Sequence, residues 1–134
     1  MEWFADTWFF IALLDRRDSH HQRAVRIFSR IPDARDLVTH DAVLTELLAY
    51  FSDQGVDIRK AAIAIVRRTM RHSQVVPANR ELFLLAVDRY AGRPDKQYSL
   101  VDCMSMVLME QRGIRHVLTN DHHFSQAGFV VVNE

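Results

Sequence analysis

Short apolar runs alternate along the chain with longer segments in which apolar residues recur every three or four positions. The short runs are rich in β-branched residues and predict strands, while the period of the longer segments predicts amphipathic helices. The predicted strands are 2–5, 36–39, 73–77, 115–119 and 129–132. The predicted helices are 7–14, 42–51, 57–71, 80–92, 99–111 and a segment from about Ser19 to Pro32. We therefore expect an α/β fold of three layers, α/β/α, with a short, mainly parallel central sheet.

Residues that favour helix caps and turns lie between the predicted strands and helices. Asp41, Asn79 and Ser99 stand where helices are predicted to begin, and their side-chain oxygens suit the free backbone N–H groups of a first turn. Gly55 and Gly113 are expected at helix ends, and the polar segment 120–128 is expected to be a turn. No linker or repeat divides the sequence, so we expect residues 1–134 to form a single domain.

Four acidic residues fall where a parallel sheet binds its ligands, outside the carboxyl ends of the strands. Asp6 directly follows the first predicted strand, and Glu46 lies in the helix after the second. Asp102 lies in the first turn of the helix that starts at Ser99, and Asp121 follows the strand 115–119. We expect these four carboxylates to point toward one edge of the sheet.

Each of these acids also has a purely structural interpretation. Asp6 and Asp121 suit helix caps, and Asp102 completes a Ser-x-x-Asp capping box with Ser99. Glu46 stands among leucines on a helix that has its own cap, so solvent exposure is its alternative. The residues taken singly leave both interpretations open. Capping, however, predicts nothing about where the four acids lie relative to one another.

Carboxylates that crowd together repel each other and take up protons unless a cation compensates their charge. Oxygen ligands suit hard divalent ions, and Mg²⁺ or Mn²⁺ held by a few carboxylates is the usual arrangement for phosphate chemistry. The histidine pairs at 20–21 and 122–123 offer no His-Glu-x-x-His or Cys-x-x-Cys spacing for zinc. His40 and His122 stand beside the predicted edge, where they either contact substrate or are simply exposed.

Charge and composition bear on where the protein is located and on whether it binds nucleic acid, but they do not identify a partner. Lys and Arg number 17, as do Asp and Glu, so no net charge attracts nucleic acid. Positive charge is nevertheless concentrated between residues 58 and 80, which include no acid, and in a second series between residues 16 and 30. Either series is a solvated helix face or a phosphate-binding surface. No secretory leader and no apolar run near 20 residues is evident, so we expect a cytoplasmic protein without a membrane span.

The acids and their neighbours resemble those of the PIN domain, and most closely the VapC-like ribonucleases of toxin–antitoxin pairs. The shared features are Asp6-Thr7, Glu46 in a leucine-rich helix, Ser99-Leu-Val-Asp102 and Thr119-Asn-Asp121, and they span nearly the whole chain. The resemblance implies that Asp6, Glu46, Asp102 and Asp121 are the catalytic residues and hold Mg²⁺ or Mn²⁺. It also implies that three hydroxyl residues orient the carboxylates or cap their helices: Thr7, Ser99 and Thr119.

The function implied by this resemblance is a divalent-metal-dependent endoribonuclease that hydrolyses RNA phosphodiester bonds. Its implied partners are an RNA substrate, a VapB-like antitoxin and a second copy of the chain in a homodimer. The alternatives are a stand-alone PIN nuclease without an antitoxin and an inactive PIN scaffold that binds RNA or protein. The complete set of four acids argues against the inactive scaffold. An aspartyl phosphatase is disfavoured because Trp8 stands where its second Asp would be.

Overall fold

Five short parallel strands form one sheet at the centre of the computed structural model, which describes residues 1–134. The strands are β1 (Trp3–Ala5), β2 (Leu37–His40), β3 (Gln74–Val76), β4 (His116–Leu118) and β5 (Val130–Val132). Their order in the sheet is β3-β2-β1-β4-β5, which makes β1 the central strand. Trp3 lies opposite Leu37 on one side and His116 on the other. Because every pair is parallel, each connection must cross over the sheet, and the helices occupy these crossovers.

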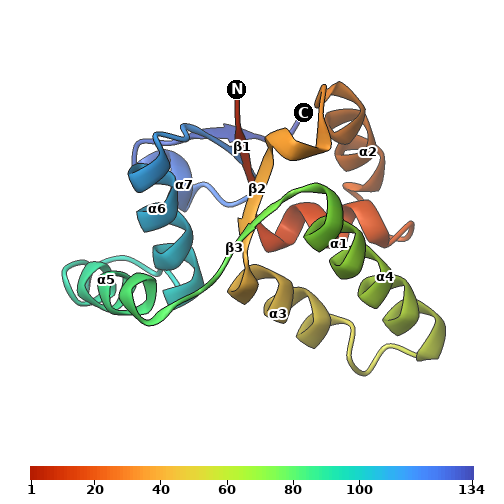
Figure 1. The fold of residues 1–134 in the computed structure, drawn as a ribbon, viewed down its shortest axis with the longest axis horizontal. Helices are drawn as coiled ribbons and strands as arrows, with labels where there is room; N and C mark the ends of the chain where they lie inside the picture. The colour runs from red at the N-terminus through yellow and green to blue at the C-terminus, as the bar shows by residue number, and fades with distance from the viewer.

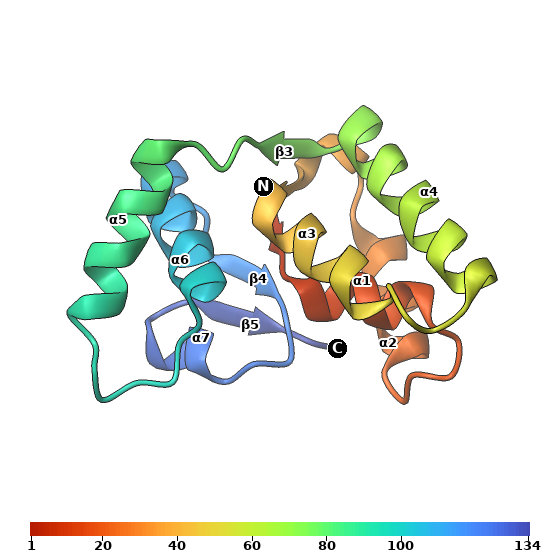
Figure 2. The ribbon, with the colours of Figure 1, turned by 90° about the horizontal axis from the view of Figure 1, so that it is seen from below.

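The helices cover both faces of this sheet (Figure 1). They are α1 (Thr7–Leu14), α2 (His21–Arg30), α3 (Asp41–Tyr50), α4 (Val56–His72), α5 (Arg80–Ala91), α6 (Leu100–Arg112) and α7 (His123–Gln126). A short 3₁₀ helix, η1 (Ala34–Asp36), precedes β2. Figure 1 and Figure 2 show α5, α6 and α7 on one side of the sheet and α1 to α4 on the other. The predicted α/β/α architecture with a parallel sheet is confirmed.

The central strands are buried because helices pack on both of their faces. Phe4, Val38 and Val117 have no solvent-exposed surface and belong to one continuous hydrophobic core. Cys103, from α6, is a free cysteine buried in the same core, where it packs as a small apolar residue. Strands covered on both faces bury successive side chains, and in β2 all four residues are buried, Thr39 and His40 included.

Several predicted boundaries are wrong, and hydrogen bonding explains the first of them. Asp41 is not the cap of α3; His40 is, because its Nδ1 accepts a hydrogen bond from the backbone N–H of Ala42. Asp41 instead begins the helix and accepts a hydrogen bond from the N–H of Ala78 through Oδ2. Histidine is an uncommon cap, so the preference for Asp misplaced the boundary by one residue.

Other differences lie in connecting segments. The predicted turn at 120–128 contains the short helix α7, and α2 begins at His21 rather than near Ser19. Gly55 does not end α3, which stops at Tyr50; it lies at φ 110° and precedes α4. Gly113 ends α6 in the left-handed region, as predicted, at φ 69°.

The topology brings distant residues to the carboxyl ends of the central strands. Ala5 at the end of β1 lies opposite Leu118 at the end of β4. The backbone N–H of Asp6 extends this pairing and donates to the carbonyl of Leu118 over 3.2 Å. Residues 6 and 119 are therefore neighbours although 113 positions separate them. Among the helices, none combines the length and the apolar character that crossing a membrane requires.

Candidate active site

Asp6 is a buried carboxylate at the end of the central strand. Only 7% of its surface is exposed, and Thr119 Oγ1 donates a 2.8 Å hydrogen bond to its Oδ2. Asp6 occupies the cap position of α1 in extended backbone, yet its side chain makes no capping hydrogen bond. The capping interpretation therefore does not account for this residue.

The environment of Asp6 disfavours its negative charge. Burial raises the pKa of Asp6 to about 7, and repulsion from Asp102 adds to the rise. The hydrogen bond from Thr119 opposes this shift, and Glu46 contributes further repulsion. No Lys or Arg forms an ion pair with Asp6. A buried acid with acidic neighbours and no cationic side chain is an arrangement that an added cation would stabilise.

Glu46 projects from the second turn of α3 toward the start of α1. Its Oε1 accepts a 2.5 Å hydrogen bond from Thr7 Oγ1, and the residue is half-buried. The Thr7 hydroxyl thus fixes one oxygen of Glu46 beside the residue that follows Asp6. Solvent exposure, the alternative interpretation of Glu46, does not describe this position.

Asp102 and Ser99 form the capping box that the sequence suggested. Ser99 Oγ accepts from the backbone N–H of Asp102, and Asp102 Oδ2 accepts from the N–H of Ser99, both over 3.0 Å. Burial raises the pKa of Asp102, and repulsion from Asp121 and Glu46 adds to the rise. Asp102 therefore caps α6 and also belongs to the acidic group, so its two interpretations are compatible.

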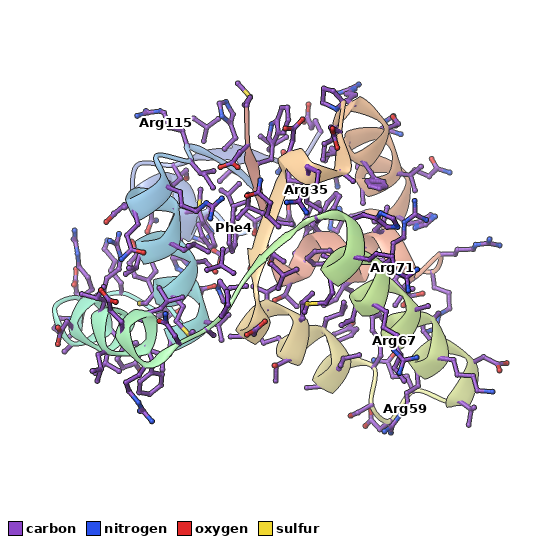
Figure 3. All side chains as sticks on the ribbon, in the orientation of Figure 1. Phe4, Arg35, Arg59, Arg67, Arg71 and Arg115 are labelled. Atoms are coloured by element: carbon purple, nitrogen blue, oxygen red, sulfur yellow. The ribbon has the colours of Figure 1, made fainter.

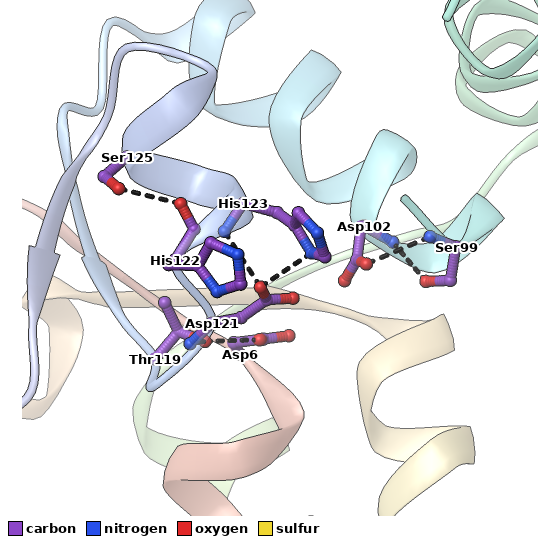
Figure 4. Close-up of polar contacts among 8 residues, drawn as sticks. All are labelled: Asp6, Ser99, Asp102, Thr119, Asp121, His122, His123 and Ser125. Carbon is purple, nitrogen blue, oxygen red and sulfur yellow. Dashed lines mark hydrogen bonds and ion pairs between the residues drawn. The ribbon is translucent and has the colours of Figure 1, made fainter. Parts of the chain in front are cut away.

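Asp121 is held by the short segment between β4 and α7. Its backbone N–H donates to Thr119 Oγ1 over 3.1 Å, so one hydroxyl connects Asp121 with Asp6. Its Oδ1 lies 2.9 Å from both the backbone nitrogen and the ring Nδ1 of His123. Figure 4 shows these contacts, with the Asp102 side chain directed toward the same region.

His123 is the residue of this site whose contact the sequence did not reveal. Its ring packs edge-on against Tyr98. The ring also anchors Asp121. Its position two residues after an acid, at the start of a helix, is the signal from which this contact could have been inferred.

The four acids share one region but are not closed around one point. Repulsion couples Asp6 to Asp102 and Glu46, and Asp102 to Asp121. No three His, Cys, Asp or Glu side chains converge closely enough to coordinate a single ion as they stand. The donor set nevertheless consists of hard oxygens, and its charge lacks a Lys or Arg partner. Such oxygen donors suit Mg²⁺ or Mn²⁺ in their chemistry.

The two histidines predicted beside this edge differ from each other. His40 is wholly buried, so the suggestion that it contacts substrate or is exposed is wrong. Its Nε2 lies 2.9 Å from Ser105 Oγ, and burial lowers the pKa of His40 to about 4. His122 is exposed, and its ring packs against that of His123 with centroids 4.5 Å apart.

Comparison with known families agrees with the geometry. Residues 4–130 match the PIN domain, and the chain belongs to the PIN domain family. The sequence is 32% identical over 130 residues to the 23S rRNA-specific endonuclease VapC20 of Mycobacterium tuberculosis, with 96% of each chain covered. The predicted resemblance to this family is therefore confirmed.

Solved structures show the same fold. The crystal structure of M. tuberculosis VapC20, described as a Sarcin-Ricin loop cleaving toxin, superposes with a TM-score of 0.89 at 28% identity. That superposition covers 99% of this chain and 100% of the VapC20 chain. FitAcB from Neisseria gonorrhoeae gives a TM-score of 0.72 at 16% identity and covers 98% of this chain and 96% of its own. At such identity, FitAcB shows the shared fold alone.

Proposed function

We propose that this protein is a divalent-metal-dependent endoribonuclease, and the toxin of a VapBC-type toxin–antitoxin pair. The observation that carries the proposal is the group of acids around buried Asp6, whose charge no Lys or Arg balances. The similarity to VapC20 over 96% of both chains supports RNA as the substrate. We further propose that residues 1–134 form one nuclease domain.

In this proposal Asp6, Glu46 and Asp102 hold the principal ion, and Asp121 completes that site or helps to hold a second one. A bound Mg²⁺ or Mn²⁺ supplies a more nucleophilic water and neutralises charge on the phosphate and the departing oxygen. The protein's own part is to keep the carboxylates in place. Thr119 orients Asp6, Thr7 orients Glu46 and Ser99 orients Asp102. His123 anchors Asp121 in the same way.

The partners belong to the proposal as well. We propose a VapB-like antitoxin, a homodimer and a cytoplasmic location, because the chain is similar to a VapC protein over 96% of both sequences. A stand-alone PIN nuclease without an antitoxin has the same site and remains the second candidate. Co-purification of the chain with the product of a neighbouring small open reading frame separates these two possibilities.

Cleavage of labelled RNA tests the enzymatic part directly. We expect cleavage by the purified protein in Mn²⁺ and none in EDTA. Asp6→Asn removes one charge from the acidic group, while Asp53→Asn removes the same charge from an exposed turn and is the matched control. Cleavage that persists in EDTA, or in Asp6→Asn at the rate of the control, would contradict the proposal.

A further inference from the structure

The exposed side of α4 carries a row of positive charge away from the acidic group. Lys60, Arg67 and Arg71 are exposed and, at separations of seven and four residues, project within about 40° of one another on a helix. Arg59 and Arg68, also exposed, flank this row. These five residues are called the α4 basic face below. Figure 3 shows Arg59, Arg67 and Arg71 following one another along α4.

Nothing within the chain neutralises the α4 basic face. Asp57 is the sole acid of α4, and no acid occurs between residues 58 and 80. None of the ion pairs of the structure involves α4. Because charges in physiological salt are screened over about 8 Å, acids farther away than that do not cancel this local charge. The zero net charge of the chain therefore conceals a positive surface.

The chemistry of the α4 basic face suits phosphate groups. Four of its five residues are arginines, whose planar guanidinium groups bind phosphate oxygens in pairs. A protein-binding surface generally has an apolar centre that is depleted in charge. The exposed residues of α4 beside these basic side chains include Ala64 and two apolar residues, Val56 and Met70, that lie 14 positions apart, so the surface is mainly charged and has no continuous apolar centre. A polyanionic backbone fits this surface better than a protein does.

We infer that the α4 basic face binds the phosphate backbone of the RNA substrate at a distance from the point of cleavage. This inference rests on the proposed ribonuclease function and adds a second contact region to it. At about 1.5 Å per residue, the 17 residues of α4 extend over about 25 Å. An RNA that follows this helix is anchored well beyond the nucleotides at the acidic group.

The arrangement of the helices sets the length of RNA required. α4 packs against α3, the helix that carries Glu46. In Figure 2, α3 lies between α6, which carries Asp102, and α4. In this view α3 therefore lies between the two regions that the RNA would contact. A short oligonucleotide fills the acidic edge alone, whereas a longer structured RNA contacts both.

Paired variants test this inference. Arg67→Gln/Arg71→Gln removes two charges from the centre of the α4 basic face, and glutamine preserves helix propensity. Arg93→Gln/Arg115→Gln removes two exposed charges from other parts of the chain and is the control. Binding of an RNA stem–loop and of a short single-stranded RNA is measured in EDTA over a range of salt concentrations. Cleavage of both RNAs is measured in Mn²⁺.

We expect the α4 variant to bind the stem–loop roughly tenfold more weakly than the parent. The slope of the logarithm of the binding constant against the logarithm of the salt concentration should be shallower by about 0.7–0.9 for each lost phosphate contact. Cleavage of the short RNA should equal that of the parent, and the control should bind like the parent. Equal weakening in both variants, or an unchanged salt dependence in the α4 variant, would overturn the inference. So would an α4 variant that binds RNA normally but loses binding to an acidic peptide. Failure of the proposed function is distinguishable, because the parent would then cleave neither RNA in Mn²⁺.

Discussion

Asp6 and His40 are two buried polar residues at the ends of neighbouring strands, and their surroundings differ. Both ring nitrogens of His40 have partners, Ser105 Oγ and the N–H of Ala42, and the buried ring is neutral. Asp6 is buried beside other acids, and burial with their repulsion raises its pKa to about 7. A satisfied neutral group contributes to stability, whereas a carboxylate with unbalanced charge is retained at a cost to stability. The comparison separates a residue that stabilises the fold from one that we propose to be functional.

Loss of catalysis in Asp6→Asn is the largest effect that the comparison predicts. We expect RNA cleavage to fall at least about 100-fold, the scale on which removal of one charge-stabilising group acts in an active site. The protein should remain folded, because the neutral amide relieves repulsion. Initial rates in Mn²⁺ and circular dichroism measure the two properties. A variant that loses activity by unfolding would remove the support that this experiment gives.

Asp6 and His40 should contribute in opposite directions to the pH dependence of the free energy of unfolding. The contribution should change by up to about 4 kcal/mol for Asp6 and by about 3 kcal/mol for His40. The folded-state pKa of Asp6 is raised from 3.8 to about 7, so its contribution is full below pH 3.8 and is lost as pH rises through 7. The folded-state pKa of His40 is lowered from 6.5 to about 4, so its contribution is full above pH 6.5 and is lost as pH falls through 4.

Urea unfolding in EDTA checks these signs. Asp6→Asn should match the parent near pH 4 and be more stable than the parent near pH 8. The free energy of unfolding of Asp6→Asn should rise with pH between 4 and 6.5. The contribution of His40 rises over this range, and the opposing contribution of Asp6 is absent from the variant. An Asp6→Asn protein whose stability follows the parent's at every pH would show that Asp6 is not strained by its charge.

His40→Ala should lower the free energy of unfolding by roughly 3 kcal/mol, because it removes a buried ring and the cap of α3. Cleavage per folded molecule should be unchanged, the reverse of the Asp6→Asn result. Denaturant unfolding and cleavage rates on the same preparation measure both. Loss of cleavage in a stable His40→Ala protein would place His40 in the functional site after all.

Ser99→Ala is expected to have the smallest effect, about 1 kcal/mol of stability, from loss of the hydroxyl half of the capping box. The Asp102 carboxylate keeps its bond from the Ser99 N–H, so cleavage should fall less than tenfold. Ser29→Ala, on α2, removes an exposed hydroxyl and is the matched control. A loss as large as that of Asp6→Asn would mean that the Ser99 hydroxyl has a direct role.

The sequence predicted the sheet and its longer helices because these follow from local periodicity, and one rule about parallel strands was enough to place the four acids near one edge. Asp6 and Asp121 could be assigned to one edge because Asp6 directly follows β1 and Asp121 lies three positions after the end of β4. The bond between Thr119 and Asp6 joins positions 113 residues apart, and periodicity carries no information at that range. The prediction that His40 contacts substrate or is exposed was wrong for a related reason, because its partner Ser105 lies 65 residues away. Whether a polar residue is satisfied depends on such distant partners.

Calorimetric titration of Mn²⁺ into the metal-free protein near pH 7 tests the central claim most directly. The account predicts that the parent binds Mn²⁺ and releases protons as it does so, because part of Asp6 is protonated at that pH. Asp6→Asn should bind much more weakly and release fewer protons, while Asp53→Asn behaves like the parent. Equal Mn²⁺ binding by the parent and Asp6→Asn, or no binding by the parent, would contradict the claim that these acids form a metal site.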